Sequence, residues 1–171
     1  MRILMLLRHG KSDWSSPTER DFDRPLAERG RKAIKRMAAW MLAQDCLPDY
    51  ILSSPAARAK ETALRLCKKA GLDEAMIHFD ERLYLADLAQ LLQMLGECPA
   101  QAGRIMLVGH NPGLEDLVRF LCGPELPLSS TGKLLPTTAL AQIRLPDDWR
   151  GLAERSGRLL AITRPEALSE D

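Results

Sequence analysis

Two histidines in this chain each follow an apolar run of the length of a β-strand. His9 comes after residues 3–7, with Arg8 between them, and His110 comes after residues 105–108 and one glycine. A neutral imidazole can attack an electrophile, and the planar guanidinium group of arginine binds phosphoryl oxygens through paired donors. These residue types together indicate phosphoryl transfer, provided that the fold brings them to one place.

The elements that must position these side chains are predicted from hydrophobic periodicity. The short apolar runs lack a helical period, which favours strands buried on both faces, as in a parallel sheet. Strands are predicted at residues 3–7, 50–52, 77–79, 105–108, 138–145 and 158–163. Helices are predicted at residues 26–44, 88–95 and 112–121, where apolar side chains have helical spacing, and from Pro55 onward. Strands that alternate with helices imply an α/β fold with a mostly parallel central sheet.

A third cationic group is expected at the same edge of the sheet. Ser54 followed by Pro55 is typical of a helix start, which puts Arg58 in the first turn after the strand at residues 50–52. Because the carboxyl ends of parallel strands share one edge, Arg8, Arg58 and both histidines are predicted to converge on one small anion. Taken by itself, Arg58 would more often be a solvent-exposed helix arginine.

The predicted mechanism uses His9 as a nucleophile. The positive charges of Arg8 and Arg58 disfavour a protonated imidazole, so His9 would attack phosphorus and form a transient phosphohistidine that water hydrolyses. His110 would donate hydrogen bonds to the phosphoryl oxygens. No carboxylate cluster is placed to bind magnesium, so arginines are expected to neutralise the phosphate, and neither a metal nor another cofactor is predicted.

Proton donation to an ester leaving group needs a further acid. Glu81 lies just after the strand predicted at residues 77–79 and is the candidate by sequence position. The alternative is that Glu81 is a surface carboxylate that pairs with Arg82.

Composition limits the range of functions. The 171 residues are most simply a single domain, residues 1–171, that ends in a short polar tail at about residues 164–171. The 24 lysines and arginines balance 23 acidic residues, so no general affinity for nucleic acid or membranes is expected. No apolar run has the length of a transmembrane helix or a signal peptide, and the widely spaced cysteines favour reduced thiols in a cytoplasmic protein.

Three motifs, in this order, resemble the histidine phosphatase superfamily, which is phosphoglycerate mutase-like, and within it the short SixA-type phosphohistidine phosphatases. The motifs are Leu7-Arg8-His9-Gly10, the segment from Ser53 to Ala63, and Val108-Gly109-His110-Asn111-Pro112. The resemblance implies a three-layer α/β/α sandwich, with His9 as the phosphorylated nucleophile and Arg8, Arg58 and His110 as the phosphate pocket. It also makes Ser15, where the mutases usually have asparagine, a candidate phosphate ligand.

The resemblance implies a metal-independent phosphatase whose partner is a phosphohistidine-bearing protein, such as a phosphotransfer domain. SixA-type members are understood to work without the acid that the mutases use, because the nitrogen of a phosphoramidate protonates easily. The enzymatic alternatives are a phosphatase of small phosphate esters and a mutase-like enzyme, although the chain lacks the longer insertions that cover a mutase substrate. The non-enzymatic alternative is a phosphate-binding adaptor, which would not need histidine at position 9.

Overall fold

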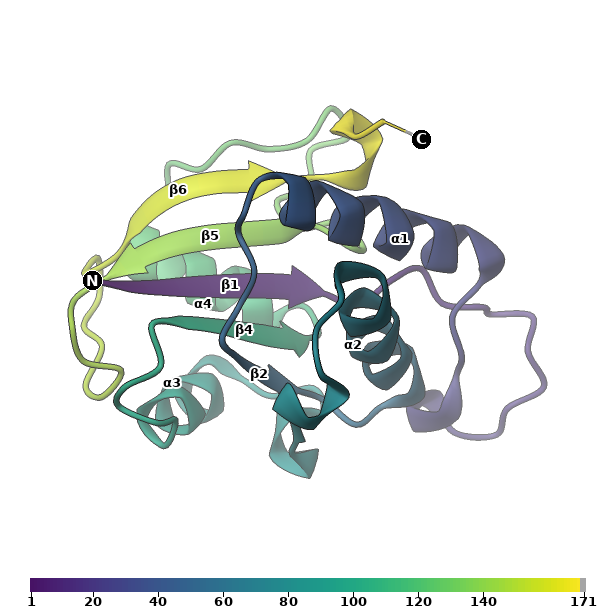
Figure 1. The fold of residues 1–171 in the computed structure, drawn as a ribbon, viewed down its shortest axis with the longest axis horizontal. Helices are drawn as coiled ribbons and strands as arrows, with labels where there is room; N and C mark the ends of the chain where they lie inside the picture. Colours follow the sequence, from purple (N-terminus) through teal and green to yellow (C-terminus); the bar gives the residue numbers. More distant parts are fainter. Residues whose placement is uncertain (170–171) are drawn as a thin grey trace.

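A six-stranded sheet forms the centre of the protein (Figure 1). The computed structural model describes residues 1–169. In the spatial order β3-β2-β4-β1-β5-β6, the strands are Ile77–Phe79, Tyr50–Ser53, Arg104–Gly109, Arg2–Arg8, Leu140–Leu145 and Arg158–Thr163. The first four are parallel, whereas β5 is antiparallel to β1 and β6 is antiparallel to β5. The prediction of a mostly parallel sheet is confirmed.

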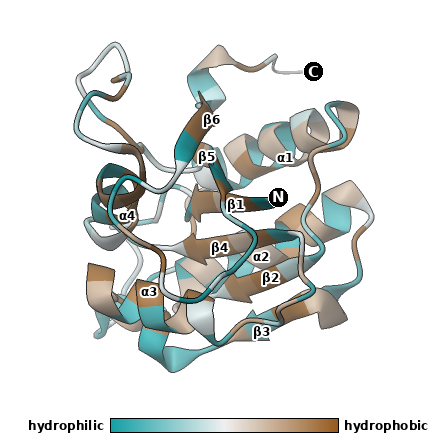
Figure 2. Cartoon of the chain, turned by 90° about the vertical axis from the view of Figure 1, so that its left-hand side faces the viewer, coloured by the Kyte–Doolittle hydropathy of each residue, from teal (hydrophilic) through white to brown (hydrophobic). Residues whose placement is uncertain are grey.

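Helices cover both faces of this sheet. α1 (Glu28–Ala43) and α2 (Ala57–Ala70) pack on one face, and α3 (Leu88–Gly96) and α4 (Gly113–Cys122) pack on the other. Single 3-10 turns, η1 to η4, are formed by Asp21–Asp23, Glu74–Met76, Glu81–Leu83 and Pro165–Ala167. Figure 2 shows the predicted α/β/α sandwich from one end, with the apolar strands between the two helical layers.

The central strand β1 shows why the sheet needs both helical layers. Leu4 and Leu6 belong to the core on the side of α3 and α4, while Met5 and Leu7 belong to the core on the side of α1 and α2. All four side chains are completely buried. Because successive strand side chains point to opposite faces, a continuous apolar run requires cover on both sides. Arg8 is the last residue of β1, so it lies at the carboxyl edge of the sheet.

Two helices start later than their sequence signals predict. α2 begins three residues after Ser54, and α4 begins two residues after Asn111, with no side-chain cap on either helix. The Ser54 hydroxyl accepts from the backbone N–H of Ala56, just before α2, and also contacts His110, while the Asn111 amide donates to the carbonyl oxygen of Leu135. Both side chains therefore make long-range hydrogen bonds at the sheet edge.

Smaller differences concern the C-terminal third of the chain. β5 begins at Leu140 instead of the predicted residue 138, since Thr138 has a φ of 63°, which interrupts an extended strand. In the predicted polar tail, Arg164 binds the carbonyl oxygens of Pro127 and Leu134, and η4 follows it. The last two residues of that tail lie outside the described residues. Within residues 1–169, no helix combines the length and the apolar character that crossing a membrane requires.

A substitution at Gly30 on α1 tests how tightly this helix packs on the loop after β1. A Cβ atom at Gly30 would lie 2.3 Å from the backbone carbonyl oxygen of Lys11, so helix or loop would have to shift. We expect Gly30→Ala to lower the free energy of unfolding by about 1–3 kcal/mol, although alanine is the better helix former. Urea denaturation measures this loss. The exposed Arg29→Ala on the same helix is the control, and equal stability of wild type and Gly30→Ala would refute the packing argument.

Candidate active site

The predicted residues surround one pocket of about 220 Å³ at the carboxyl edge of the sheet. Arg8 ends β1 and His9 follows it, His110 directly follows β4, and Arg58 lies in the first turn of α2. All four side chains line the pocket, and the ring centroids of the two histidines are 5.1 Å apart. The shared edge of the parallel strands thus brings together residues that are up to 102 positions apart in the sequence.

His9 is held as a neutral imidazole. Only 6% of its surface is exposed, and Nδ1 lies 2.7 Å from the carbonyl oxygen of Gly10, which can only accept, so Nδ1 carries the proton. The other ring nitrogen, Nε2, lies 3.4 Å from Nε of Arg58, which donates to it. Burial lowers the pKa of His9 to about 3, the hydrogen bond to Gly10 opposes this shift, and the neighbouring ring of His110 and the positive charges of Arg58 and Arg8 lower the pKa further. The arginines favour the neutral ring, as predicted, but burial is the larger cause.

The side chain of Ser54 orients His110. From the sequence, this serine was expected only to start the helix after the strand at residues 50–52. The Ser54 hydroxyl lies 2.7 Å from Nε2 of His110 and accepts a hydrogen bond from the backbone N–H of Ala56. A serine hydroxyl can donate to one partner while it accepts from another, and when it donates to Nε2 the histidine proton is on Nδ1. Nδ1 is buried and has no partner within residues 1–169, so in this tautomer it is a spare donor for an anion in the pocket. Burial lowers the pKa of His110 to about 4, followed by the charge of Arg58.

These two buried neutral imidazoles predict that stability depends on pH. Histidine in the unfolded chain titrates at about pH 6.5, well above the folded pKa values of about 3 and about 4. Below that pH the unfolded state binds more protons than the folded state, so stability falls as the pH falls. We expect the free energy of unfolding to drop by about 1 kcal/mol per histidine and pH unit as the pH falls from about 6.5 to about 5. Urea denaturation at stepwise pH measures the slope.

The variant His9→Asn provides the control for this pH dependence, because it removes one of the two titrating groups. Its slope should be about half that of wild type. A free energy of unfolding that stays constant over the same pH range would show that the two rings are not buried as neutral groups.

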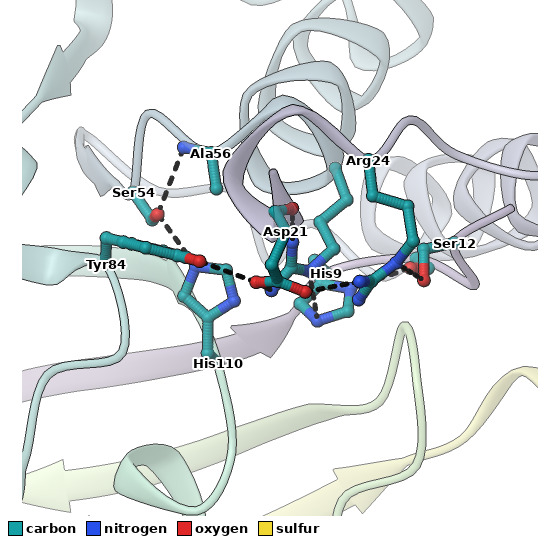
Figure 3. Close-up of polar contacts among 10 residues, drawn as sticks. His9, Ser12, Asp21, Arg24, Ser54, Ala56, Tyr84 and His110 are labelled. Atoms are coloured by element: carbon teal, nitrogen blue, oxygen red, sulfur yellow. Dashed lines mark hydrogen bonds and ion pairs between the residues drawn. The ribbon is translucent and has the colours of Figure 1, made fainter. Parts of the chain in front are cut away.

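Asp21 in the loop after β1 holds Arg58 in place. Nη1 of Arg58 donates to the backbone carbonyl oxygen of Asp21 at 2.8 Å, and Nη2 donates to its carboxylate at 2.9 Å. The carboxylate also accepts from the hydroxyl of Tyr84 at 2.6 Å and pairs with Arg24 (Figure 3). These hydrogen bonds, that of Tyr84 first and then those of Arg58 and Arg24, lower the pKa of Asp21. Asp21 therefore stays ionised and fixes two guanidinium groups beside the histidines.

Arg24, Asp21, Ser12 and Tyr84 are the site residues that the sequence did not single out. Arg24 is only 8% exposed, lines the pocket, and donates from Nε to the Ser12 hydroxyl at 2.9 Å. These residues, except Tyr84, lie between the strand predicted at residues 3–7 and the helix predicted at residues 26–44, which indicates only their general location. No periodicity or spacing within a loop indicates which of its side chains turn inward, because loop conformation is set by long-range contacts.

Gly10 and Thr62 connect the segment that carries His9 to α2. The backbone N–H of Gly10 donates to the Thr62 hydroxyl at 3.0 Å, and that hydroxyl donates to the carbonyl oxygen of Arg58 at 2.6 Å. A Cβ atom at Gly10 would lie 2.9 Å from Cδ1 of Ile34 on α1. A side chain at this position would force Ile34 to shift, so glycine lets the loop pack closely against α1.

Two other sequence candidates, Glu81 and Ser15, do not line the pocket. Glu81, the predicted acid, does not line it, and its carboxylate makes no hydrogen bond or ion pair within residues 1–169. Its expected partner Arg82 binds Asp80 and Glu97 instead. Ser15, the other candidate, is exposed and donates to the Asp13 carboxylate at 2.6 Å. Ser12 is the loop serine that lines the pocket.

The comparison with protein families agrees with this geometry. Residues 4–94 match the family model of the histidine phosphatase superfamily, branch 1. This chain belongs to the histidine phosphatase superfamily. The matched residues include the nucleophile candidate His9 and the phosphate-binding candidates Arg8 and Arg58. Within the described part of the chain, no group of three or more histidine, cysteine, aspartate or glutamate side chains is arranged to hold a metal ion.

Similar proteins place the chain within this superfamily. A crystal structure assigned as phosphohistidine phosphatase SixA from Agrobacterium tumefaciens is 30% identical, with a TM-score of 0.79 over 96% of this chain and 99% of that one. A chloroplastic protein of Arabidopsis thaliana is 32% identical over 78% of this chain, which spans 65% of the length of that relative. The mycobacterial glucosyl-3-phosphoglycerate phosphatase shares the fold. It is 21% identical, with a TM-score of 0.64 over 96% of this chain and 98% of that one.

Proposed function

We propose that this histidine phosphatase hydrolyses protein phosphohistidine, with His9 as the nucleophile. Nε2 of His9 attacks phosphorus and forms a nitrogen–phosphorus bond while the bond from phosphorus to the substrate imidazole breaks. The released imidazole takes a proton from solvent, and water then hydrolyses the phosphorylated His9 to inorganic phosphate and the neutral enzyme. The observation that carries this proposal is the buried, unprotonated Nε2 facing Arg58.

The phosphoryl group would be neutralised by the arginines of the pocket. Arg8 and Arg58 can present guanidinium donors to its oxygens, and Nδ1 of His110 adds a donor that is already oriented by Ser54. These groups are held by the fold before substrate binds, so little reorganisation accompanies the transfer. Because their charge and direction serve the transition state, the proposed reaction requires no metal ion.

The acid–base character of the pocket supports a phosphoramidate substrate over an ester. An alkoxide leaving group needs a proton from a nearby acid, whereas an imidazole nitrogen is protonated readily near neutral pH. The carboxylate bonded to the pocket arginines is that of Asp21, whose lowered pKa keeps it ionised. Glu81 lies outside the pocket lining. A leaving group that takes its proton from water fits this arrangement.

The mouth of the pocket supports a protein partner. Trp14 and Leu85 line it and are 73% and 57% exposed, and the Trp14 ring lies 3.6 Å from the guanidinium carbon of Arg24. An apolar, open rim of this kind can contact residues that flank a phosphohistidine on a surface such as that of a phosphotransfer domain. The four cysteines are free thiols, which supports the cytoplasm as the location.

Hydrolysis of a small phosphate ester is the second candidate, since an open pocket of about 220 Å³ also admits such a substrate. Initial rates on a phosphohistidine peptide and on sugar phosphates, all in the presence of EDTA, distinguish the two. We expect at least a tenfold higher kcat/KM on the peptide, about 1.4 kcal/mol in the barrier, and no effect of Glu81→Gln on it. Faster hydrolysis of the esters, lost in Glu81→Gln, would favour the second candidate. No turnover of either substrate would favour a binding adaptor.

A further inference from the structure

A second, larger groove of about 700 Å³ lies between α1 and α2, outside the catalytic pocket. Its lining is entirely charged and contains one acidic side chain, that of Glu28. The six others are cationic: Arg31, Lys32, Lys35, Arg65, Lys68 and Lys69. The proposed reaction uses none of these residues.

The positive charge of this groove is concentrated, and acidic side chains compensate only part of it. The whole chain carries a net charge of +1, yet four of its seven lysines line this one groove. Arg31 and Arg65 donate to Glu61 at 2.8 and 2.5 Å, which partly neutralises them. The four lysines are exposed and form no ion pair within residues 1–169. Lysines gathered without acidic partners repel one another, so a bound polyanion would stabilise them.

The groove lies along the two helices whose N-terminal turns are next to the catalytic pocket. On α2, Arg65 and Lys69 follow Arg58 by seven and eleven residues, which corresponds to roughly 10 and 16 Å along a helix. On α1, Arg31 directly follows Gly30, which packs against the backbone of the pocket residue Lys11. A polypeptide spans about 3.3 Å per residue when extended. A segment with its phosphohistidine at His9 can therefore place residues about three to six positions away in the groove.

We propose that this groove, lined by the residues named above, docks an acidic segment that flanks the phosphohistidine in the protein substrate. The proposal rests on the proposed function. Carboxylates on such a segment complement the four unpaired lysines. A nucleic acid fits less well, since no aromatic side chain lines the groove for base stacking and the chain as a whole is nearly neutral. Contacts between exposed charges are individually weak, so the docking should act on KM and depend on salt.

Two matched phosphohistidine peptides test the docking. One carries aspartate and glutamate at positions three to six on both sides of the phosphohistidine, and the other carries asparagine and glutamine there. We expect wild type to show about a tenfold higher kcat/KM on the acidic peptide at low ionic strength, through KM, and no preference at about 0.5 M salt. The variant Lys35→Gln, Lys68→Gln, Lys69→Gln should lose the preference. The matched variant Lys133→Gln, Arg144→Gln, Arg158→Gln, altered outside the groove, should keep it.

Binding of the same acidic peptide without phosphate, followed by fluorescence anisotropy, separates the two proposals. Binding that the groove variant loses, with neither phosphopeptide hydrolysed, would support the groove and refute the proposed function. Equal hydrolysis of both phosphopeptides without binding would overturn the docking and leave the proposed function standing. A single-stranded oligonucleotide of equal charge that binds the groove more tightly than the acidic peptide would also overturn it, in favour of a nucleic-acid site.

Discussion

His9→Asn should abolish turnover, with kcat reduced by about 10⁴-fold or more. The variant keeps a polar side chain of similar size but removes the nitrogen that attacks phosphorus, so the covalent route is lost. Initial rates on a phosphohistidine peptide measure the loss. Inorganic phosphate should still bind to Arg8, Arg58 and His110, which controls for damage to the pocket.

The intermediate itself provides a direct assay for the same residue. After rapid acid-free denaturation of wild type with a ³²P-labelled substrate, the label should be on His9 and should be released by acid, as expected for a phosphoramidate. His9→Asn should carry no label. Label that resists acid, as in a serine ester, would identify a different nucleophile, and turnover by His9→Asn close to that of wild type would rule out the covalent mechanism.

Arg58→Lys should lower kcat/KM by about 10²–10³-fold even though it keeps the positive charge. The guanidinium of Arg58 serves three acceptors at once: Nε faces His9, Nη1 binds the carbonyl oxygen of Asp21, and Nη2 binds its carboxylate. A lysine ammonium is a single point of charge and cannot reproduce that planar arrangement. Steady-state kinetics on a phosphohistidine peptide, together with the inhibition constant of vanadate, measure the effect.

A double-mutant cycle of Arg58→Lys and Asp21→Asn tests whether Asp21 acts by positioning Arg58. Asp21 acts through Arg58 in this structure, so Asp21→Asn should cost about tenfold in wild type and much less in the Arg58→Lys background. Fully additive losses would mean that Asp21 serves the reaction independently of Arg58. A loss below about threefold for Arg58→Lys would mean that charge alone matters at this position.

The order of the elements could be predicted from the sequence because burial periodicity is a local property. β1 is buried on both faces and is therefore continuously apolar. α1, α3 and α4 each bury one face against the sheet, which gives their apolar residues helical spacing. Helix starts were predicted less well. Ser54 and Asn111 are good caps in isolation, but each has a stronger long-range use at the edge of the sheet.

The sheet, its mostly parallel order and the convergence of Arg8, His9, Arg58 and His110 were predictable from the sequence, since each of these residues lies at the end of a regular element. The rest of the site depends on contacts that appear only in the folded protein. The contacts of Asp21 with Arg58 and Tyr84 join residues 37 and 63 positions apart, and they arise from an irregular loop. Glu81 and Ser15 do not line the pocket, and this too depends on how the chain folds around them. Side chains on loops are placed by the partners that they meet in space, and a single sequence carries no local signal for those partners.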